Sequence, residues 1–327
     1  MAGGGFPPKC PMWPLCPRDF GVGHDSPVKL GWSERDIPDL SGRVAVVTGA
    51  NRGLGREVTR YLAGHGARVV MACRDESSGD ETAAALRAEG VSGPLEVRAL
   101  DLAGLASIEK FAAGLAGEPR LDLLANNAGL MAVDRGLTAD GFETHMGVNH
   151  LGHFALTARL LPLLLTTTGS RVVTMSSIVA RIGRVDLDDL LWERRPYDRW
   201  QAYAQSKLAN LLFTFELDRR LKAAGAPTAA LAAHPGGSRT SLGRNARHWT
   251  NRTLPMWTTF AQPASLGALG FVRAATDPSA RGGEYYGPMF QVWGRPIRET
   301  PGRQARNPAV AAALWECSEQ LTGCAFL

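Results

Sequence analysis

Residues 44–63 read VAVVTGANRGLGREVTRYLA, a stretch in which an apolar run, a glycine-rich turn and a helix-compatible run follow one another directly. Its first residues, Val44 to Thr48, are mostly β-branched and predict a buried strand. A turn with three glycines follows, and residues 56–63 are compatible with a helix. Because glycine has no Cβ, this turn can reverse tightly and bring backbone N–H groups and the positive end of the helix close to phosphate groups. We therefore predict a strand–turn–helix unit that binds a phosphate-bearing ligand.

The chain beyond Gly42 repeats this alternation of short apolar runs and amphipathic stretches. Such alternation is typical of βαβ units around a parallel sheet. We predict a single α/β domain over residues 42–327, with a Rossmann-type, doubly wound parallel sheet and helices on both faces. The predicted strands are residues 44–48, 67–73, 95–100, 121–126, 171–176 and 229–234.

Residues 1–41 differ in composition from the predicted domain. Glycine and proline crowd the first part of this segment, and it has no apolar periodicity. We interpret residues 1–41 as a loose N-terminal extension. The aromatic residues Trp13, Phe20 and Trp32 leave open the alternative that part of the extension packs on the domain or covers the mouth of a pocket.

The composition is that of an ordinary globular protein, with 45% hydrophobic and 20% charged residues among 327. Lys and Arg total 36 against 31 for Asp and Glu, and they are spread along the chain, so no nucleic-acid partner is favoured. No apolar stretch reaches the roughly 20 residues of a membrane helix, and no secretory signal is recognisable. The five cysteines form no C-x-x-C pair. We therefore expect a cytoplasmic protein without a membrane anchor.

Two motifs lie where strands are predicted to end. Residues 123–129 read LLANNAG, an apolar strand that ends in polar and small residues, and Asp101 with Leu102 follows the third predicted strand. The carboxyl ends of parallel strands are where an open α/β sheet collects its ligands. We therefore expect both motifs to border one binding site.

Residues 203–207 read YAQSK and fall on a predicted helix that extends to about residue 224. Tyr203 and Lys207 share one face of that helix, so the ammonium can favour the ionised form of the phenol. Strand 171–176 ends at Ser176, and the hydroxyl of the following Ser177 can donate to a carbonyl oxygen as negative charge develops there. These groups suit acid–base chemistry on a carbonyl or an alcohol.

The order of these motifs resembles the short-chain dehydrogenase/reductase family over about residues 42–321. Residues 48–55 are similar to the family's T-G-x-x-x-G-x-G turn, and the N-N-A-G and Y-x-x-S-K motifs match two further family elements. The separation of Ser177 and Tyr203 by 26 positions is most similar to retinol-dehydrogenase-like bacterial members. Retinol dehydrogenases often carry an N-terminal membrane anchor, and its absence from the pattern here argues against retinoid substrates. The resemblance implies hydride exchange between a nicotinamide cofactor and a small-molecule carbonyl or alcohol.

The resemblance also implies roles for individual residues. Tyr203 would deliver or remove the proton, Lys207 would lower its pKa and bind the nicotinamide ribose, and Ser177 would polarise the carbonyl. Asn149 matches the family asparagine that helps to hold a proton-relay water. The cofactor would contact Gly49, Asn51, Arg52, Gly53, Leu54, Gly55, Arg74, Asp101, Leu102, Asn127, Ala128, Gly129, Tyr203, Lys207, Pro235, Gly236 and Thr240.

The expected cofactor is NADP(H), preferred over NAD(H). An acidic residue after the second strand accepts from both ribose hydroxyls and repels a 2′-phosphate. Here the position at which NAD-preferring relatives carry Asp is apolar, and Arg74 follows it. Arg52 in the glycine turn is a second cation, and a guanidinium can bind a phosphate through two parallel hydrogen bonds. We expect Asp75 to point away and to pair with an arginine.

The expected substrate is largely apolar. The predicted substrate loop, residues 240–262, and the segment 178–202 are rich in aromatic and aliphatic side chains, with Arg194, Arg195 and Arg244 as the charged exceptions. Some of these side chains would line one wall of the substrate cleft or pack beside it, and the sequence leaves both alternatives open. They are Leu190, Leu191, Trp192, Tyr197 and Trp200.

Three histidines, His145, His150 and His153, lie near Asn149 in the sequence. No carboxylate or cysteine stands at ligand spacing from them, so we interpret them as structural or exposed and expect no metal site.

Two other functions stay open at this point. One is a catalytically silent dinucleotide-binding sensor, and the presence of Asn149, Ser177, Tyr203 and Lys207 argues against it. The other is a sugar-nucleotide epimerase, which also uses Tyr-x-x-x-Lys, and the N-N-A-G element argues against it. The resemblance is compatible with a homo-oligomer, and the sequence does not determine the substrate or the favoured direction.

Overall fold

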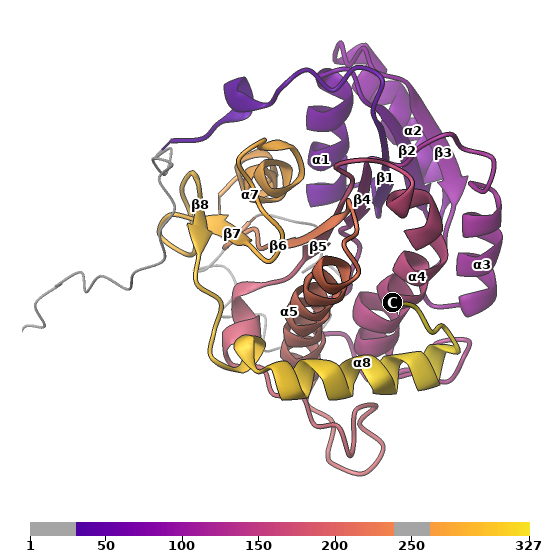
Figure 1. The fold of residues 1–327 in the computed structure, drawn as a ribbon, viewed down its shortest axis with the longest axis vertical. Helices are drawn as coiled ribbons and strands as arrows, with labels where there is room; N and C mark the ends of the chain where they lie inside the picture. The colour runs from indigo at the N-terminus through magenta and orange to yellow at the C-terminus, as the bar shows by residue number, and fades with distance from the viewer. Residues whose placement is uncertain (1–30, 239–261) are drawn as a thin grey trace, which may run out of the picture. The chain divides into compact units, whose positions relative to one another are not determined.

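The computed structural model describes residues 31–238 and 262–327. These residues form an eight-stranded sheet in the order β3-β2-β1-β4-β5-β6-β7-β8 (Figure 1). The strands from β1 to β7 pair in parallel, and β8 runs antiparallel to β7. Their bounds are β1 Val44–Thr48, β2 Arg68–Cys73, β3 Leu95–Ala99, β4 Leu123–Asn126, β5 Arg171–Met175, β6 Ala229–Ala233, β7 Tyr285–Pro288 and β8 Pro296–Glu299.

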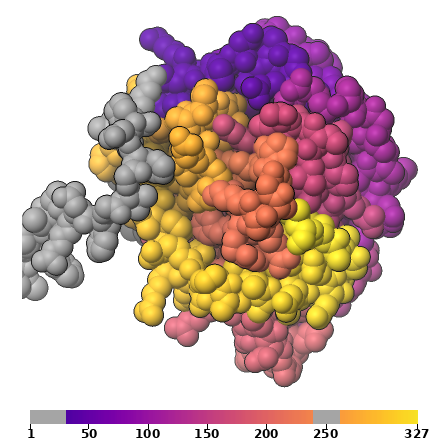
Figure 2. Space-filling model, in the orientation of Figure 1, coloured from indigo at the N-terminus to yellow at the C-terminus, as the bar shows by residue number. Residues whose placement is uncertain are grey.

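Helices cover both faces of the sheet (Figure 1). One face packs against α1 (Gly53–Gly64), α2 (Glu76–Ala88) and α7 (Ala264–Thr276). The other packs against α3 (Leu105–Ala113), α4 (Gly152–Leu165) and α5 (Arg199–Ala223). The last helix, α8 (Pro308–Thr322), lies against α5 and is seen in yellow on the surface in Figure 2.

The central strand shows why the sequence specifies this arrangement. All five residues of β1 are buried, because helices exclude water from both faces of a parallel sheet. Ala45 and Val47 join the core beneath α1 and α7, whereas Val44 and Val46 join the core on the opposite face. The period of two along a strand therefore divides one apolar run between two cores.

The strand order reverses beside β1, which pairs with β2 on one edge and with β4 on the other. In open α/β sheets, ligands bind at such a switch point, outside the carboxyl ends of the strands. The fold thus brings the ends of β1, β4 and β5 to one place, which is where the candidate site lies.

The predicted fold class is confirmed, and all six predicted strands are present with shifts of one or two residues at some ends. The two strands that we did not predict are β7 and β8. The β7 sequence, YYGP, contains glycine and proline and has no β-branched run. Its pairing with β6 and β8, and not its own pattern, makes it a strand.

The described end of the predicted extension, residues 31–41, packs into the domain. Trp32 is only 2% exposed, and Ile37 and Leu40 share its core with residues of α1. Trp32 therefore packs on the domain and is not part of a loose extension. Trp13, Phe20 and the predicted loop 240–262, apart from Gln262, lie outside the described residues.

No helix within residues 31–238 and 262–327 is both long and apolar enough to cross a membrane.

Candidate active site

A cavity of about 310 Å³ lies at the switch point of the sheet. Almost all of the predicted cofactor residues line it: Gly49, Asn51, Arg52, Gly53, Leu54, Gly55, Arg74, Asp101, Leu102, Asn127, Ala128, Gly129, Tyr203, Lys207 and Pro235. Gly236 follows Pro235 with a left-handed φ of 61° but is not in the cavity wall, and Thr240 lies outside the described residues. Residues far apart in the sequence are thus brought to one site.

The glycine turn has the geometry that the sequence predicts. Gly49 and Gly53 have φ values of 64° and 55°, which favour glycine. A Cβ on Gly55 would lie 2.1 Å from the carbonyl oxygen of Gly49 and 2.6 Å from Nδ2 of Asn127. The first turn of α1 therefore packs directly on the end of β1, and only glycine fits between them.

Thr48 ties the ends of β1 and β4 together, and our sequence analysis missed its role. The backbone N–H groups of Asn127 and Ala128 each donate to Thr48 Oγ1 at 2.9 Å. The amide Nδ2 of Asn127 donates to the carbonyl oxygen of Thr48 at 2.8 Å. The threonine that opens the T-G-x-x-x-G-x-G turn was the available signal for this contact.

The N-terminus of α1 is open toward the cavity. The first N–H groups of a helix have no partner within the helix, and the N-cap residue Arg52 gives them no side-chain hydrogen bond. The first turn also carries no acidic residue. These N–H groups are therefore available to an anion.

Two arginines border the same end of the cavity. The guanidinium groups of Arg52 and Arg74 have no ion pair with any carboxylate of the described residues. Asp75 also borders the cavity, but its carboxylate accepts from the N–H of Ser78 and caps α2. This corrects our expectation that Asp75 pairs with an arginine. The helix cap accounts for its acidic side chain.

The helix α5 places Tyr203 and Lys207 together at the cavity wall. Both side chains are buried, with 6% and 4% of each residue exposed. Lys207 Nζ donates to the carbonyl oxygen of Met175 at 3.1 Å, and Ser176 Oγ donates to the carbonyl oxygen of Lys207 at 2.8 Å. Two hydrogen bonds thus tie this turn of α5 to the end of β5.

Burial shifts the pKa values of both Lys207 and Tyr203. Burial lowers the pKa of Lys207 to about 8. Burial raises the pKa of Tyr203, and a hydrogen bond with Ser177 acts in the opposite direction. The phenol thus has Ser177 as its partner, while the Lys207 ammonium binds a backbone oxygen. The predicted lowering of the phenol pKa by Lys207 stays a prediction.

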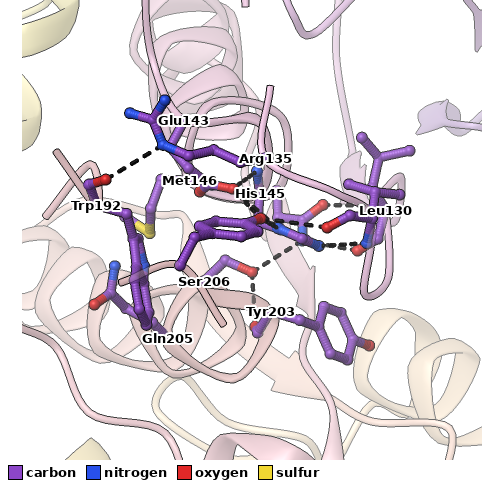
Figure 3. A network of polar contacts seen from close by, with 12 residues as sticks. Leu130, Arg135, Glu143, His145, Met146, Trp192, Tyr203, Gln205 and Ser206 are labelled. Carbon is purple, nitrogen blue, oxygen red and sulfur yellow. Dashed lines mark hydrogen bonds and ion pairs between the residues drawn. The ribbon is translucent and has the colours of Figure 1, made fainter. Parts of the chain in front are cut away.

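Asn149 lies in a π-helical segment, η2 (Met146–Leu151), and not in a regular α-helix. Such segments are frequent at functional sites. Its side chain accepts from the N–H of Leu130 at 2.7 Å and donates to the carbonyl oxygen of Leu130 at 3.0 Å and to Ser206 Oγ at 2.9 Å. The Asn149 amide therefore links Leu130, in the loop after β4, to Ser206, whose hydroxyl donates to the carbonyl oxygen of Tyr203; Figure 3 labels these three partners.

The three histidines near Asn149, His145, His150 and His153, are all buried. Burial lowers the pKa of His150 to about 3 and that of His153 to about 4. His145 has a carboxylate partner, since its Nδ1 lies 3.0 Å from Glu143 Oε1, which corrects our expectation that none of the three had one. No group of three or more His, Cys, Asp or Glu residues in the described part of the chain is arranged to hold a metal ion.

The aromatic segment before Tyr203 divides into buried and exposed parts. Leu190 and Trp192 are each 6% exposed, and the guanidinium of Arg195 stacks 3.7 Å from the Trp192 ring centre. Trp200 is 45% exposed, and its ring contacts Tyr203 edge-on at 6.4 Å between ring centres. Of the two tryptophans, only Trp200 is thus accessible beside Tyr203.

Comparison with known proteins agrees with this geometry. The family model for short chain dehydrogenases matches residues 43–251. Retinol dehydrogenase 12 of Homo sapiens is 42% identical over 289 residues, which is 87% of each chain, and polyprenol dehydrogenase of Mus musculus is 43% identical over 88% of this chain and 86% of that protein.

Solved structures give the same result. A putative uncharacterized protein from Mycobacterium paratuberculosis superposes with a TM-score of 0.77 and 46% identity, covering 91% of this chain and all of that one. The RhlG/NADP complex of Pseudomonas aeruginosa superposes with a TM-score of 0.59 and 26% identity, covering 76% of this chain and 95% of that one.

The glycine turn yields a test of the cavity. We expect Gly55→Ala to lower the affinity for NADPH and NADH by about tenfold or more, because its Cβ would push α1 away from the end of β1. Gly64→Ala is the matched control, because a Cβ at Gly64 on the same helix meets nothing within 4 Å. Fluorescence titration of both variants measures the effect, and equal affinities would contradict our account of the turn.

Proposed function

The chain belongs to the short-chain dehydrogenase family, and on this premise we propose that it is an NADP(H)-dependent oxidoreductase for largely apolar aldehydes, ketones and alcohols. The observation that carries the proposal is the shared cavity, which the glycine turn of β1 and α1 and the pair Tyr203 and Lys207 line together. The glycine turn and the N-terminus of α1 would hold the phosphates of a dinucleotide, and Tyr203 would lie at its reactive end.

The residues present fit a nicotinamide dinucleotide. The Gly49–Gly55 contact leaves no room for side chains, so a pyrophosphate can approach the backbone there. The free N–H groups of α1 and the buried ammonium of Lys207 supply positive charge at two points of the cavity. When bound, the nicotinamide supplies a hydride to the carbonyl carbon of the substrate, or accepts one from the alcohol.

Tyr203 is the proposed general acid for reduction and general base for oxidation. Its phenol gives its proton to the carbonyl oxygen as the carbon is reduced, so that the alcohol leaves with both hydrogens. The hydroxyl of Ser177, which is the hydrogen-bond partner of the phenol, is the proposed second donor to the same carbonyl oxygen once a substrate lies between them. Lys207 lies at the same cavity wall and, as the resemblance implies, is the proposed group that binds the nicotinamide ribose.

The preference for NADP(H) is supported by Arg52 and Arg74. Both border the cavity, and neither is neutralised by a carboxylate among the described residues. The carboxylate of Asp75 is oriented by the N–H of Ser78 at the start of α2 and pairs with neither arginine, so both guanidinium groups are available to a 2′-phosphate. The RhlG structure was solved as a complex with NADP, which is compatible with this assignment for the present chain.

The apolar character of the substrate is supported by the surroundings of Tyr203. Trp200 is exposed beside the phenol, and Leu130 lines the cavity. Two of the charged exceptions are occupied within the protein: Arg195 binds Asp186 at 2.7 Å, and Arg194 donates to the carbonyl oxygen of Asp188. Arg244 lies outside the described residues.

Replacement of the phenol tests the chemistry. Tyr203→Phe should lower kcat by about 10²- to 10⁴-fold while NADPH still binds, because only the proton donor is lost. NADPH oxidation with a panel of aldehydes and ketones measures kcat, and fluorescence titration measures binding. Near-normal turnover in the variant would remove Tyr203 from the mechanism, and an inactive parent enzyme would favour a silent sensor.

Replacement of Arg74 tests the cofactor assignment. Arg74→Ala should raise the KM for NADPH by about tenfold and barely change that for NADH, because only NADPH carries the 2′-phosphate. Arg281→Ala is the control. Arg281 is exposed and precedes β7, whereas the cavity lies at the carboxyl ends of the strands. A kcat/KM for NADH equal to or above that for NADPH in the unmodified enzyme would refute the preference.

Replacement of Trp200 tests the substrate class. Trp200→Ala should raise the KM for an aryl or long-chain aldehyde by about tenfold and leave that for propanal within about twofold, because the lost contact area is apolar and lies beyond a small substrate. Trp200→Phe should have a KM for the aryl or long-chain aldehyde between those of the parent and of Trp200→Ala. Turnover confined to phosphorylated or carboxylate-bearing substrates would show that the substrate is not apolar.

A further inference from the structure

A buried polar network lies beside Tyr203 and is used by none of the steps above (Figure 3). It consists of the side chains of Glu143, His145 and Tyr197, which we call the Glu143 network. Tyr197 donates to Glu143 Oε1 at 2.9 Å, and His145 Nδ1 lies 3.0 Å from the same oxygen and 2.9 Å from the Tyr197 hydroxyl. The rings of His145 and Tyr203 are 6.1 Å apart between their centres.

The network holds a buried charge. The side chains of Glu143 and His145 are both 0% exposed. Hydrogen bonds from His145 and from the N–H groups of His145 and Met146 lower the pKa of Glu143 against the effect of burial, so the carboxylate is ionised at neutral pH. A buried carboxylate requires such donors, and their geometry is therefore fixed.

The contacts also fix the proton on His145. The N–H of Val133 donates to His145 Nε2 at 3.2 Å, so Nε2 is an acceptor and the ring hydrogen lies on Nδ1. The ring thus joins the loop after β4 to the Glu143 carboxylate.

Three chain segments meet in this network around Tyr203. Val133 belongs to the loop after β4, Glu143 and His145 precede the π-helical segment, and Tyr197 belongs to the segment before α5. A second link joins two of them, because Arg135 Nε donates to the carbonyl oxygen of Trp192 at 3.3 Å (Figure 3). If Glu143 only capped the helical segment that follows it, the bonds from the N–H groups of His145 and Met146 to its carboxylate would be enough. The side-chain contacts of His145 and Tyr197 with Glu143 therefore need another explanation.

We infer that the Glu143 network positions the substrate side of Tyr203, and that Tyr197 is a positioning residue that acts through His145. The inference rests on the proposed carbonyl reduction. Because the network joins the three segments that border the phenol, it determines which face of a carbonyl the phenol meets. Its loss should therefore disturb the orientation of a substrate more than the binding of the cofactor.

The test uses Tyr197→Phe, which removes one hydroxyl, and the reduction of the prochiral ketone acetophenone by NADPH. We expect kcat/KM for acetophenone to fall about tenfold and the enantiomeric ratio of the alcohol to fall with it, while the affinity for NADPH stays within about twofold. Tyr61→Phe is the control, because it removes the same single hydroxyl, which in Tyr61 donates to the carbonyl oxygen of Ser265 at 3.2 Å and takes no part in the Glu143 network. That control should keep the enantiomeric ratio of the parent.

A second variant, Glu143→Gln, removes the charge and should change the enantiomeric ratio in the same direction. In the double variant with Tyr197→Phe, the change should be smaller than the sum of the two single changes. NADPH titration counts the folded sites of every variant. A fall in kcat that only follows the number of folded sites, at an unchanged enantiomeric ratio, would overturn the positioning role. If the parent reduces no ketone or aldehyde, the proposed function fails first, and this inference fails with it.

Discussion

The contact between the first turn of α1 and the end of β1 is the constraint on which the site depends. The absence of a side chain at Gly55 lets the helix approach the carbonyl oxygen of Gly49, and Asn127 closes the same contact from β4 through Thr48. The helix N-terminus, two arginines and the ends of three strands are thereby held around one cavity. A larger residue at Gly55 would separate these groups while leaving each of them intact.

The second requirement is the burial of an ammonium group. Lys207 is held by the carbonyl oxygen of Met175, and a Cβ on Gly129 would lie 3.2 Å from its Nζ and 3.0 Å from Oδ1 of Asn149. The turn after β4, the π-helical segment and α5 therefore converge on Gly129. An ammonium group is costly to bury, so burial lowers its pKa. A lysine exposed on the surface has no such shift.

The two sides of Tyr203 are built in different ways. On one side, the glycine turn and the ends of the strands form the wall of the cavity, so the path of the backbone sets much of that surface. On the other side, ionised and neutral side chains fix three segments to each other, and Trp200 stays accessible. This division fits a family whose members share a cofactor-binding half and differ in what they bind beside it.

The α/β class, six strands, the glycine turn and the placement of Tyr203 and Lys207 on one helix could all be predicted from the sequence, because each is encoded within a short stretch. Periodicity and the missing Cβ of glycine act over a few residues, so they can be recognised in the sequence alone. Other features depend on contacts between residues that are distant in the sequence. Strand β7 exists through its neighbours, Trp32 is buried by α1 and its surroundings, Asp75 caps a helix, and His145 finds a carboxylate and a tyrosine 52 positions away. Such contacts depend on where the fold brings side chains together, and the local pattern of residues carries no record of that.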